Sequence, residues 1–125
     1  MRVVNAEKEE YINILVSRKR IEWIACTCKV SAHAEYRFIQ RDNVVDRDLK
    51  TSIRRSPLSW KSVEDGKIYI AFDLYRYIVV DDSDNTTPII VTFADARENP
   101  IAKGTNVFEM AMFEYKKFVK KMKEK

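Results

Sequence analysis

Four short segments between residues 58 and 94 are rich in aromatic and β-branched residues and are separated by polar connections. Segments of this length and composition are typical of strands, and short connections between them favour an antiparallel meander. The pair Asp65 and Gly66 between the first two segments favours a tight hairpin turn. We therefore expect an antiparallel sheet with strands at 58–63, 67–72, 75–81 and 88–94.

The region before this sheet begins with a helical pattern. Asn5 can cap a helix over about 6–18, whose first turn is acidic and whose last turn is basic, as the helix dipole favours. Residues 21–30 then alternate apolar side chains on both sides, which favours a strand buried on both faces. Continuation of the first helix through this segment explains the same residues, so both readings remain open.

Two further helices are expected before the sheet. Ser31 can cap a helix that runs to about Arg41. Asp46 can cap a shorter one through Arg55, which ends before Pro57 because the residue ahead of a proline disfavours the helical backbone.

The last segment, 106–125, has an apolar stripe at alternating spacings of four and three, which predicts an amphipathic helix. We expect this stripe to pack on the sheet, although a groove for a cofactor or a partner is an alternative. Its members are Phe108, Met112, Tyr115, Val119 and Met122. Lysines dominate the end of the helix, where they suit the dipole and can also contact phosphates.

The composition bounds the architecture. The chain has 125 residues, of which 46% are hydrophobic, so one domain can bury a core without disulfides or metals. We expect a single α+β domain over 1–125, with N-terminal helices, a meander of three to five strands and a long basic C-terminal helix. The 23 Lys and Arg against 19 Asp and Glu give a net charge of +4, which favours an anionic partner.

No apolar run approaches the roughly 20 residues that cross a bilayer. The first eleven residues lack the apolar centre of a secretion signal. We therefore expect a cytoplasmic protein without membrane contact.

Scarcity of glycine excludes several classes of site. The chain has only Gly66 and Gly104, whereas phosphate-binding and dinucleotide-binding loops need several glycines for close backbone approach.

Metal sites lack part of their ligands. Cys26, Cys28 and His33 supply only three of the four ligands that a structural zinc site needs. The acidic run at 81–85 lacks the glycine and glutamate of a calcium loop. We expect no metal and no cofactor.

The clearest functional signal is the only histidine of the chain, His33, followed by Arg37 and Arg41 at spacings of four. On a helix these side chains share one face. An imidazole beside two permanent cations suits binding or cleavage of a phosphodiester, because histidine exchanges a proton near neutral pH and arginine binds phosphate oxygens. A solvated helix face with no further role is the alternative.

The spacing of His33, Ala34, Arg37 and Arg41, a second helix starting near Asp46, and the meander that follows resemble the small BrnT/RelE-like toxin ribonucleases. The resemblance covers about residues 30–97 and makes 1–29 and 98–125 added terminal elements. The glycine usual after the second arginine is Asp42 here, and one extra residue lies at 43–45, so the chain resembles a diverged member.

This resemblance implies metal-independent RNA cleavage, in which the ribose 2′-hydroxyl attacks its own phosphate. It implies catalytic roles for His33, Arg37 and Arg76, where histidine moves a proton and arginines hold the phosphate charge. It also implies an acidic antitoxin-like protein partner. We further expect nucleic-acid contacts from Arg41, Arg97, Lys116 and Lys120.

Two hypotheses follow for the function. The first is an endoribonuclease of the toxin type. The second is a non-catalytic module that binds nucleic acid or a protein through the same basic residues.

Overall fold

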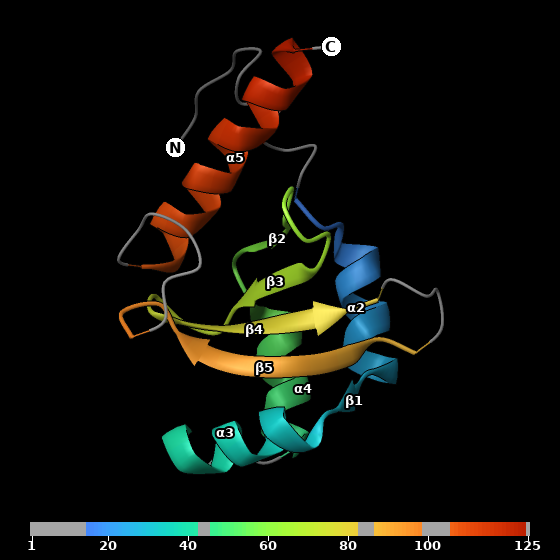
Figure 1. The fold of residues 1–125 in the computed structure, drawn as a ribbon. Helices are drawn as coiled ribbons and strands as arrows, with labels where there is room; N and C mark the ends of the chain where they lie inside the picture. The colour runs from blue at the N-terminus through green and yellow to red at the C-terminus, as the bar shows by residue number, and fades with distance from the viewer. Residues whose placement is uncertain (1–14, 43–45, 83–86, 99–105, 125) are drawn as a thin grey trace.

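A mixed sheet forms the centre of the computed structural model, and helices cover both of its faces (Figure 1). The structure describes residues 15–42, 46–82, 87–98 and 106–124, and of residues 39–42 and 46–48 it describes the backbone alone. These residues form four helices and five strands, which confirms the α+β class. The elements are α2 (Arg18–Thr27), β1 (Lys29–Val30), α3 (Ala32–Asp42), α4 (Asp46–Arg55), β2 (Ser59–Lys61), β3 (Ile68–Ala71), β4 (Arg76–Asp81), β5 (Ile89–Asp95) and α5 (Val107–Lys123).

The strand order is β1-β5-β4-β3-β2. Strands β2 to β5 form the expected antiparallel meander, and the short β1 adds to β5 in parallel. A slip in register between Val79 and Val80 marks a bulge in the β4–β5 pair. The four predicted strands are therefore confirmed, whereas the parallel edge strand was not expected in this form.

The hairpin between β2 and β3 has the turn that its sequence predicts. Gly66 has a φ of +73°, a backbone conformation that glycine adopts without steric cost. The Asp65 carboxylate accepts hydrogen bonds from the Lys67 amide (2.8 Å) and the Tyr69 hydroxyl (2.9 Å). Burial, with this bond to Asp65, raises the pKa of Tyr69, so the phenol stays protonated.

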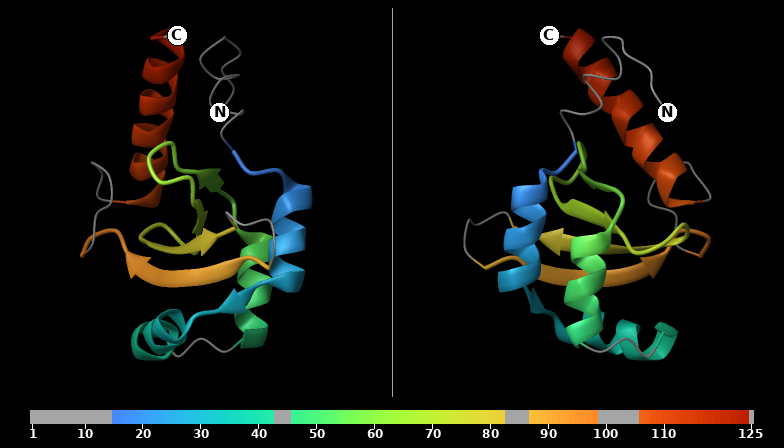
Figure 2. Two further views of the ribbon diagram at one scale, coloured as in Figure 1. Left: turned by 45° about the vertical axis from the view of Figure 1, so that its right-hand side comes forward. Right: turned by 180° about the vertical axis from the view of Figure 1, so that it is seen from behind.

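Alternating side chains of the central strands create two cores, one on each face of the sheet. Ile78 and Val80 of β4 face one side, where α2, α3 and α4 pack. Tyr77 and Val79 face the other side, where the first half of α5 packs. In the right-hand view of Figure 2, which is seen from behind, α2 and α4 lie side by side in front of the sheet, and α5 lies on its opposite face.

The first predicted helix, 6–18, lies mostly outside the described residues, and its described end is wrong. Residues 15–17 are not helical, because Leu15 forms a β-bridge with Trp60 and the Val16 amide donates to the Ser59 carbonyl (3.2 Å). Ser17 then caps α2 by accepting from the Arg20 amide (3.1 Å).

The predicted strand over 21–30 is also wrong, except at Lys29–Val30. Ile21, Ile24 and Ala25 are fully buried against the sheet, at the spacing of three and four that one face of a helix requires. The alternative of a helix here is closer to the structure, but α2 starts anew at its own cap. The helices beginning near Ser31 and Asp46 are confirmed.

The C-terminal helix is confirmed, but of the stripe predicted to form its inner face only Tyr115 is buried. The structure buries Val107, Met110, Ala111, Glu114 and Tyr115, whereas Phe108, Met112 and Met122 are 48%, 43% and 45% exposed. At about 100° per residue the buried face is rotated by roughly a quarter turn from the predicted stripe. A hydrogen bond from the Val107 amide to the Leu74 carbonyl (2.8 Å) and the Asn106 cap set this rotation.

Candidate functional site

Helix α3 presents the histidine as its sequence predicts. The Ser31 hydroxyl accepts from the Ala34 amide (3.1 Å), and the Ser31 amide donates to the Ile90 carbonyl of β5 (3.0 Å). These bonds fix the start of the helix against the sheet, with Ala34 and Phe38 buried. His33 is exposed, and Arg37, one turn further along, is half-buried.

This geometry allows proton transfer and phosphate contact on one helix. An exposed imidazole can exchange a proton with a bound molecule, and a guanidinium one turn away can bind a phosphate oxygen. Arg41 belongs to the same helix, but its side chain lies outside the described part of the chain.

Arg76, at the start of β4, is held by a carboxylate. Its Nε donates to Asp73 Oδ2 (2.7 Å), an Nη contacts the same oxygen, and its guanidinium lies 5.2 Å from the centre of the Phe72 ring. Burial alone would raise the pKa of Asp73. Hydrogen bonds from the Arg76 side chain and from the Arg76 and Tyr75 amides outweigh this effect and lower the pKa. The charge of Arg76 is therefore largely balanced within the turn.

Arg97, which follows β5, is paired in the same way. Its Nε and Nη2 donate to the two oxygens of Asp95 at 3.0 and 2.7 Å, and Asp95 is buried. The guanidinium also stacks 4.2 Å from the centre of the Tyr75 ring. The bond to Asp95 raises the pKa of Arg97 above its ordinary value. Arg97 keeps an exposed surface, but the edge of its guanidinium formed by Nε and Nη2 is occupied by Asp95.

The sheet brings some of the predicted site residues together. Arg76 is the register partner of Asp95, so Arg76 and Arg97 lie at the same end of the β4–β5 pair. A row of aromatic rings links this end to α3: Phe38 stacks on Phe93 (4.5 Å), and Phe72 meets Phe93 edge-on (5.2 Å). Arg76 and α3 therefore share one face of the sheet.

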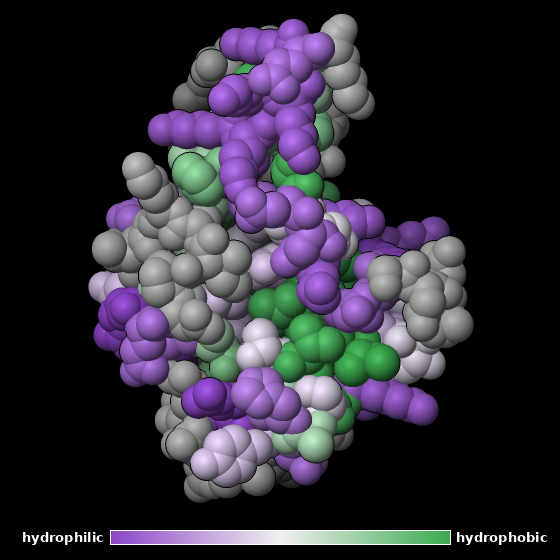
Figure 3. All heavy atoms as spheres, viewed as in Figure 1, coloured by the Kyte–Doolittle hydropathy of each residue, from purple (hydrophilic) through white to green (hydrophobic). Residues whose placement is uncertain are grey.

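Lys116 and Lys120 lie apart from this group, because α5 packs on the opposite face. We call residues 116–123 the outer half of α5, since none of them is buried and the helix extends there beyond the sheet (Figures 1 and 2). Lys116, Lys120 and Lys123 are exposed and form no ion pair with a residue that the structure describes. Figure 3 shows mainly hydrophilic side chains over this part of the helix.

The outer half of α5 is held in place by the β2–β3 hairpin. Glu114, which is buried, accepts from the Val63 amide (2.9 Å) and the Ser62 hydroxyl (3.3 Å). Lys117 pairs with Glu64 (3.0 Å), and Lys121 donates to the Val63 carbonyl (3.3 Å). These contacts fix the direction in which Lys116, Lys120 and Lys123 project.

Sequence reasoning missed a polar cluster between α2 and α4. The Cys26 thiol lies 3.2 Å from Glu22 Oε2, and Arg54 donates to both Cys26 (3.3 Å) and Glu22 (3.0 Å). The bonds from Cys26 and then from Arg54 lower the pKa of Glu22. Glu22 and Cys26 are four residues apart, so this pair becomes visible only when the segment is read as a helix.

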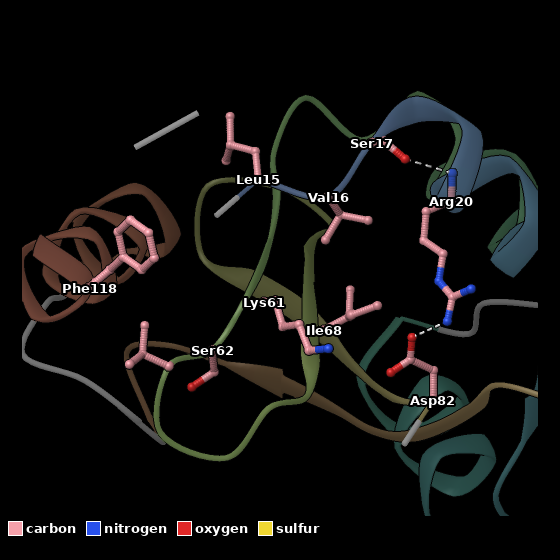
Figure 4. Close-up of a pocket in the computed structure, with 10 residues that line it drawn as sticks. Leu15, Val16, Ser17, Arg20, Lys61, Ser62, Ile68, Asp82 and Phe118 are labelled. Carbon is pink, nitrogen blue, oxygen red and sulfur yellow. Dashed lines mark hydrogen bonds and ion pairs between the residues drawn. The ribbon is translucent and has the colours of Figure 1, made fainter. Parts of the chain in front are cut away.

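A second feature missed from the sequence is a groove of about 620 Å³ between the hairpin, the start of α2 and the outer half of α5. Apolar side chains line much of it, and an Arg20–Asp82 ion pair closes one end (Figure 4). Its residues are spread from 15 to 118, so no local pattern announces it.

Within the described residues, no group of three or more His, Cys, Asp or Glu side chains is placed to hold a metal ion. None of the described helices is both long enough and apolar enough to cross a bilayer. Comparison with known proteins gave no matching family model, no matching curated protein and no matching solved structure.

Proposed function

We propose that this protein binds RNA through the lysines on the outer half of α5. The observation that carries the proposal is the projection of Lys116, Lys120 and Lys123 from the body without acidic partners among the described residues. Their ammonium groups are available to phosphates, and each phosphate contact releases counterions from the nucleic acid. The hairpin contacts of Glu114, Lys117 and Lys121 keep the helix rigid, which lowers the entropic cost of binding.

Two observations favour binding over catalysis. Arg76, expected to hold the phosphate charge during cleavage, and Arg97, expected to contact nucleic acid, are engaged by Asp73 and Asp95. The helix with the exposed lysines lies on the face of the sheet opposite to His33. Binding by the lysines therefore needs no contribution from the histidine.

The test is fluorescence anisotropy with a labelled single-stranded RNA. Replacing Lys116, Lys120 and Lys123 together by glutamine should weaken binding by about tenfold at moderate salt. The matched control replaces Lys19, Lys29 and Lys50 by glutamine, which removes the same charge from α2, β1 and α4. Equal affinity of the two triple variants would reject the proposal. A single-stranded DNA of the same sequence reports whether the ribose contributes.

A second candidate function is metal-independent RNA cleavage on α3. It is favoured by the exposure of His33 one turn before Arg37, which leaves the imidazole open to a substrate. The histidine would take the proton of the 2′-hydroxyl, whose oxygen bonds to phosphorus while the bond from phosphorus to the 5′-oxygen of the next nucleotide breaks. Water would give the departing 5′-oxygen its proton, and Arg37 would stabilise the charge that grows on the phosphate.

Cleavage is tested by incubating pure protein with end-labelled RNA in the presence of a chelator. Fragments should appear with the wild-type chain and disappear with His33→Ala, while Tyr36→Phe on the same helix should still cleave. The His33→Ala variant should bind RNA as tightly as the wild type if the lysines carry affinity. Intact RNA after incubation with the wild type removes this candidate and leaves the binding proposal standing.

A further inference from the structure

The groove beside the outer half of α5 has the size and lining of a small-molecule site. Its volume of about 620 Å³ falls within the 300–1,000 Å³ that is typical of ligand pockets. Leu15 and Val16 form one wall, Ile68 lies on β3, and Phe118 closes the side towards α5 (Figure 4). No segment that the structure describes fills the space between them.

The lining is apolar on several sides that come from distant parts of the chain. Val63, from the β2–β3 connection, joins Leu15, Val16, Ile68 and Phe118 around the hollow. Replacing the water at an apolar surface of this kind by a hydrocarbon is favourable. The groove is therefore suited to a molecule with an apolar chain.

The charges at the groove select the other end of that molecule. Arg20 and Asp82 form an ion pair in which Asp82 is buried, so the carboxylate is already compensated. Lys61 is exposed, lines the same groove and forms no ion pair with a described residue. In Figure 4 its side chain extends towards the end where Arg20 and Asp82 meet. The uncompensated charge of the groove is thus positive.

We propose that this groove binds a free amphipathic monoanion, in which a carboxylate contacts Lys61 and an apolar chain packs between Ile68, Val16 and Phe118. The proposal does not depend on RNA binding, because the residues that would contact the monoanion are different from Lys116, Lys120 and Lys123, which are assigned to RNA. The same chemistry is found in free fatty acids and in anionic membrane lipids. We assign the free acid, because the lining residues come from the segment before α2, the hairpin, β3 and α5 and so flank a single chain on several sides.

The test is titration of the full-length protein with octanoate, followed by methyl NMR. Saturable shifts are expected at Val16, Val63 and Ile68, with little change on the exposed Met112. Phe118→Ala and Lys61→Gln should each weaken binding at least fivefold, whereas Phe113→Ala and Lys67→Gln, which lie outside the lining, should not. Circular dichroism of each variant verifies that it is folded.

Two further ligands separate the sources and the role of charge. Uncharged 1-octanol should bind more weakly than octanoate, and this difference should vanish in Lys61→Gln. Vesicles that contain phosphatidylserine should not compete with octanoate. Binding to vesicles alone would overturn the proposal. So would octanoate shifts that do not saturate or that spread over Met112 and Met122, or an unchanged affinity of Phe118→Ala.

Discussion

Replacing Glu114 by alanine should lower the free energy of unfolding by about 2 kcal/mol, a value that follows from its buried hydrogen bonds. The carboxylate lies inside α5's contact with the hairpin and accepts from the Val63 amide at 2.9 Å and from the Ser62 hydroxyl at 3.3 Å. The Lys117 ammonium is 4.0 Å away. The variant removes all three interactions and leaves the backbone of the hairpin beneath an apolar methyl group.

The magnitude combines opposing contributions. A hydrogen bond to a charged acceptor contributes about 1.5–3 kcal/mol, and a buried amide left without a partner costs about 1–3 kcal/mol. The longer serine bond and the distant lysine add less, since exposed pairs are worth at most about 1 kcal/mol. Relief of the desolvation penalty of the buried carboxylate offsets part of the loss. A net value near 2 kcal/mol corresponds to a fall in Tm of about 8 °C for a domain of this size.

Urea unfolding followed by circular dichroism measures this difference directly. Glu35→Ala, which removes an exposed glutamate from α3, should change stability by less than about 0.5 kcal/mol. Glu114→Gln keeps an oxygen that can accept from Val63, so it should lie between the wild type and Glu114→Ala. If Glu114→Ala were no less stable than Glu35→Ala, the contact would not anchor α5, and the argument for a rigid lysine-bearing helix would fail.

Three further predictions concern the sheet and its turns. Asp73→Asn should lower the free energy of unfolding by about 1 kcal/mol at pH 7. Folding lowers the pKa of Asp73, so the advantage of the wild type should fade as the pH falls below the ordinary aspartate value of about 3.9. Urea unfolding at pH 7 and at pH 3 measures this difference. Gly66→Ala meets no atom within 4 Å, so only its φ of +73° is unfavourable; a loss of about 1 kcal/mol is expected in the same assay, with Gly66→Asn milder. Phe93→Ala should lose about 3–5 kcal/mol in thermal unfolding, because the ring is buried between Phe38 and Phe72; a loss below 1 kcal/mol would contradict the packing.

The elements that could be predicted are those whose information is local. Alternating apolar residues, the Asp65–Gly66 turn and the Ser31 cap each act within a few residues, and the structure has them where the sequence predicts. The ion pairs of Arg76 with Asp73 and of Arg97 with Asp95 are also local, at separations of three and two. They could have been read from the sequence once these arginines were placed next to the turns.

The elements that could not be predicted depend on distant contacts. Residues 21–27 fit a strand or a helix by their own pattern, and packing beneath the sheet decides for the helix. The inner face of α5 is set by Leu74 and by Ser62 and Val63 of the hairpin, which lie more than 30 residues away. The groove is harder still, since Leu15 and Phe118 are brought together only by the complete fold.

The salt dependence of RNA binding tests the central claim most directly. For single-stranded RNA, log K falls with log salt by about 0.7 per phosphate contact, so three lysines account for a slope of about −2. Replacing Lys116, Lys120 and Lys123 by glutamine should reduce the steepness by about 2, whereas the control at Lys19, Lys29 and Lys50 should leave it unchanged. A wild-type affinity that does not change with salt, or equal slopes for both triple variants, would contradict RNA binding by the outer half of α5.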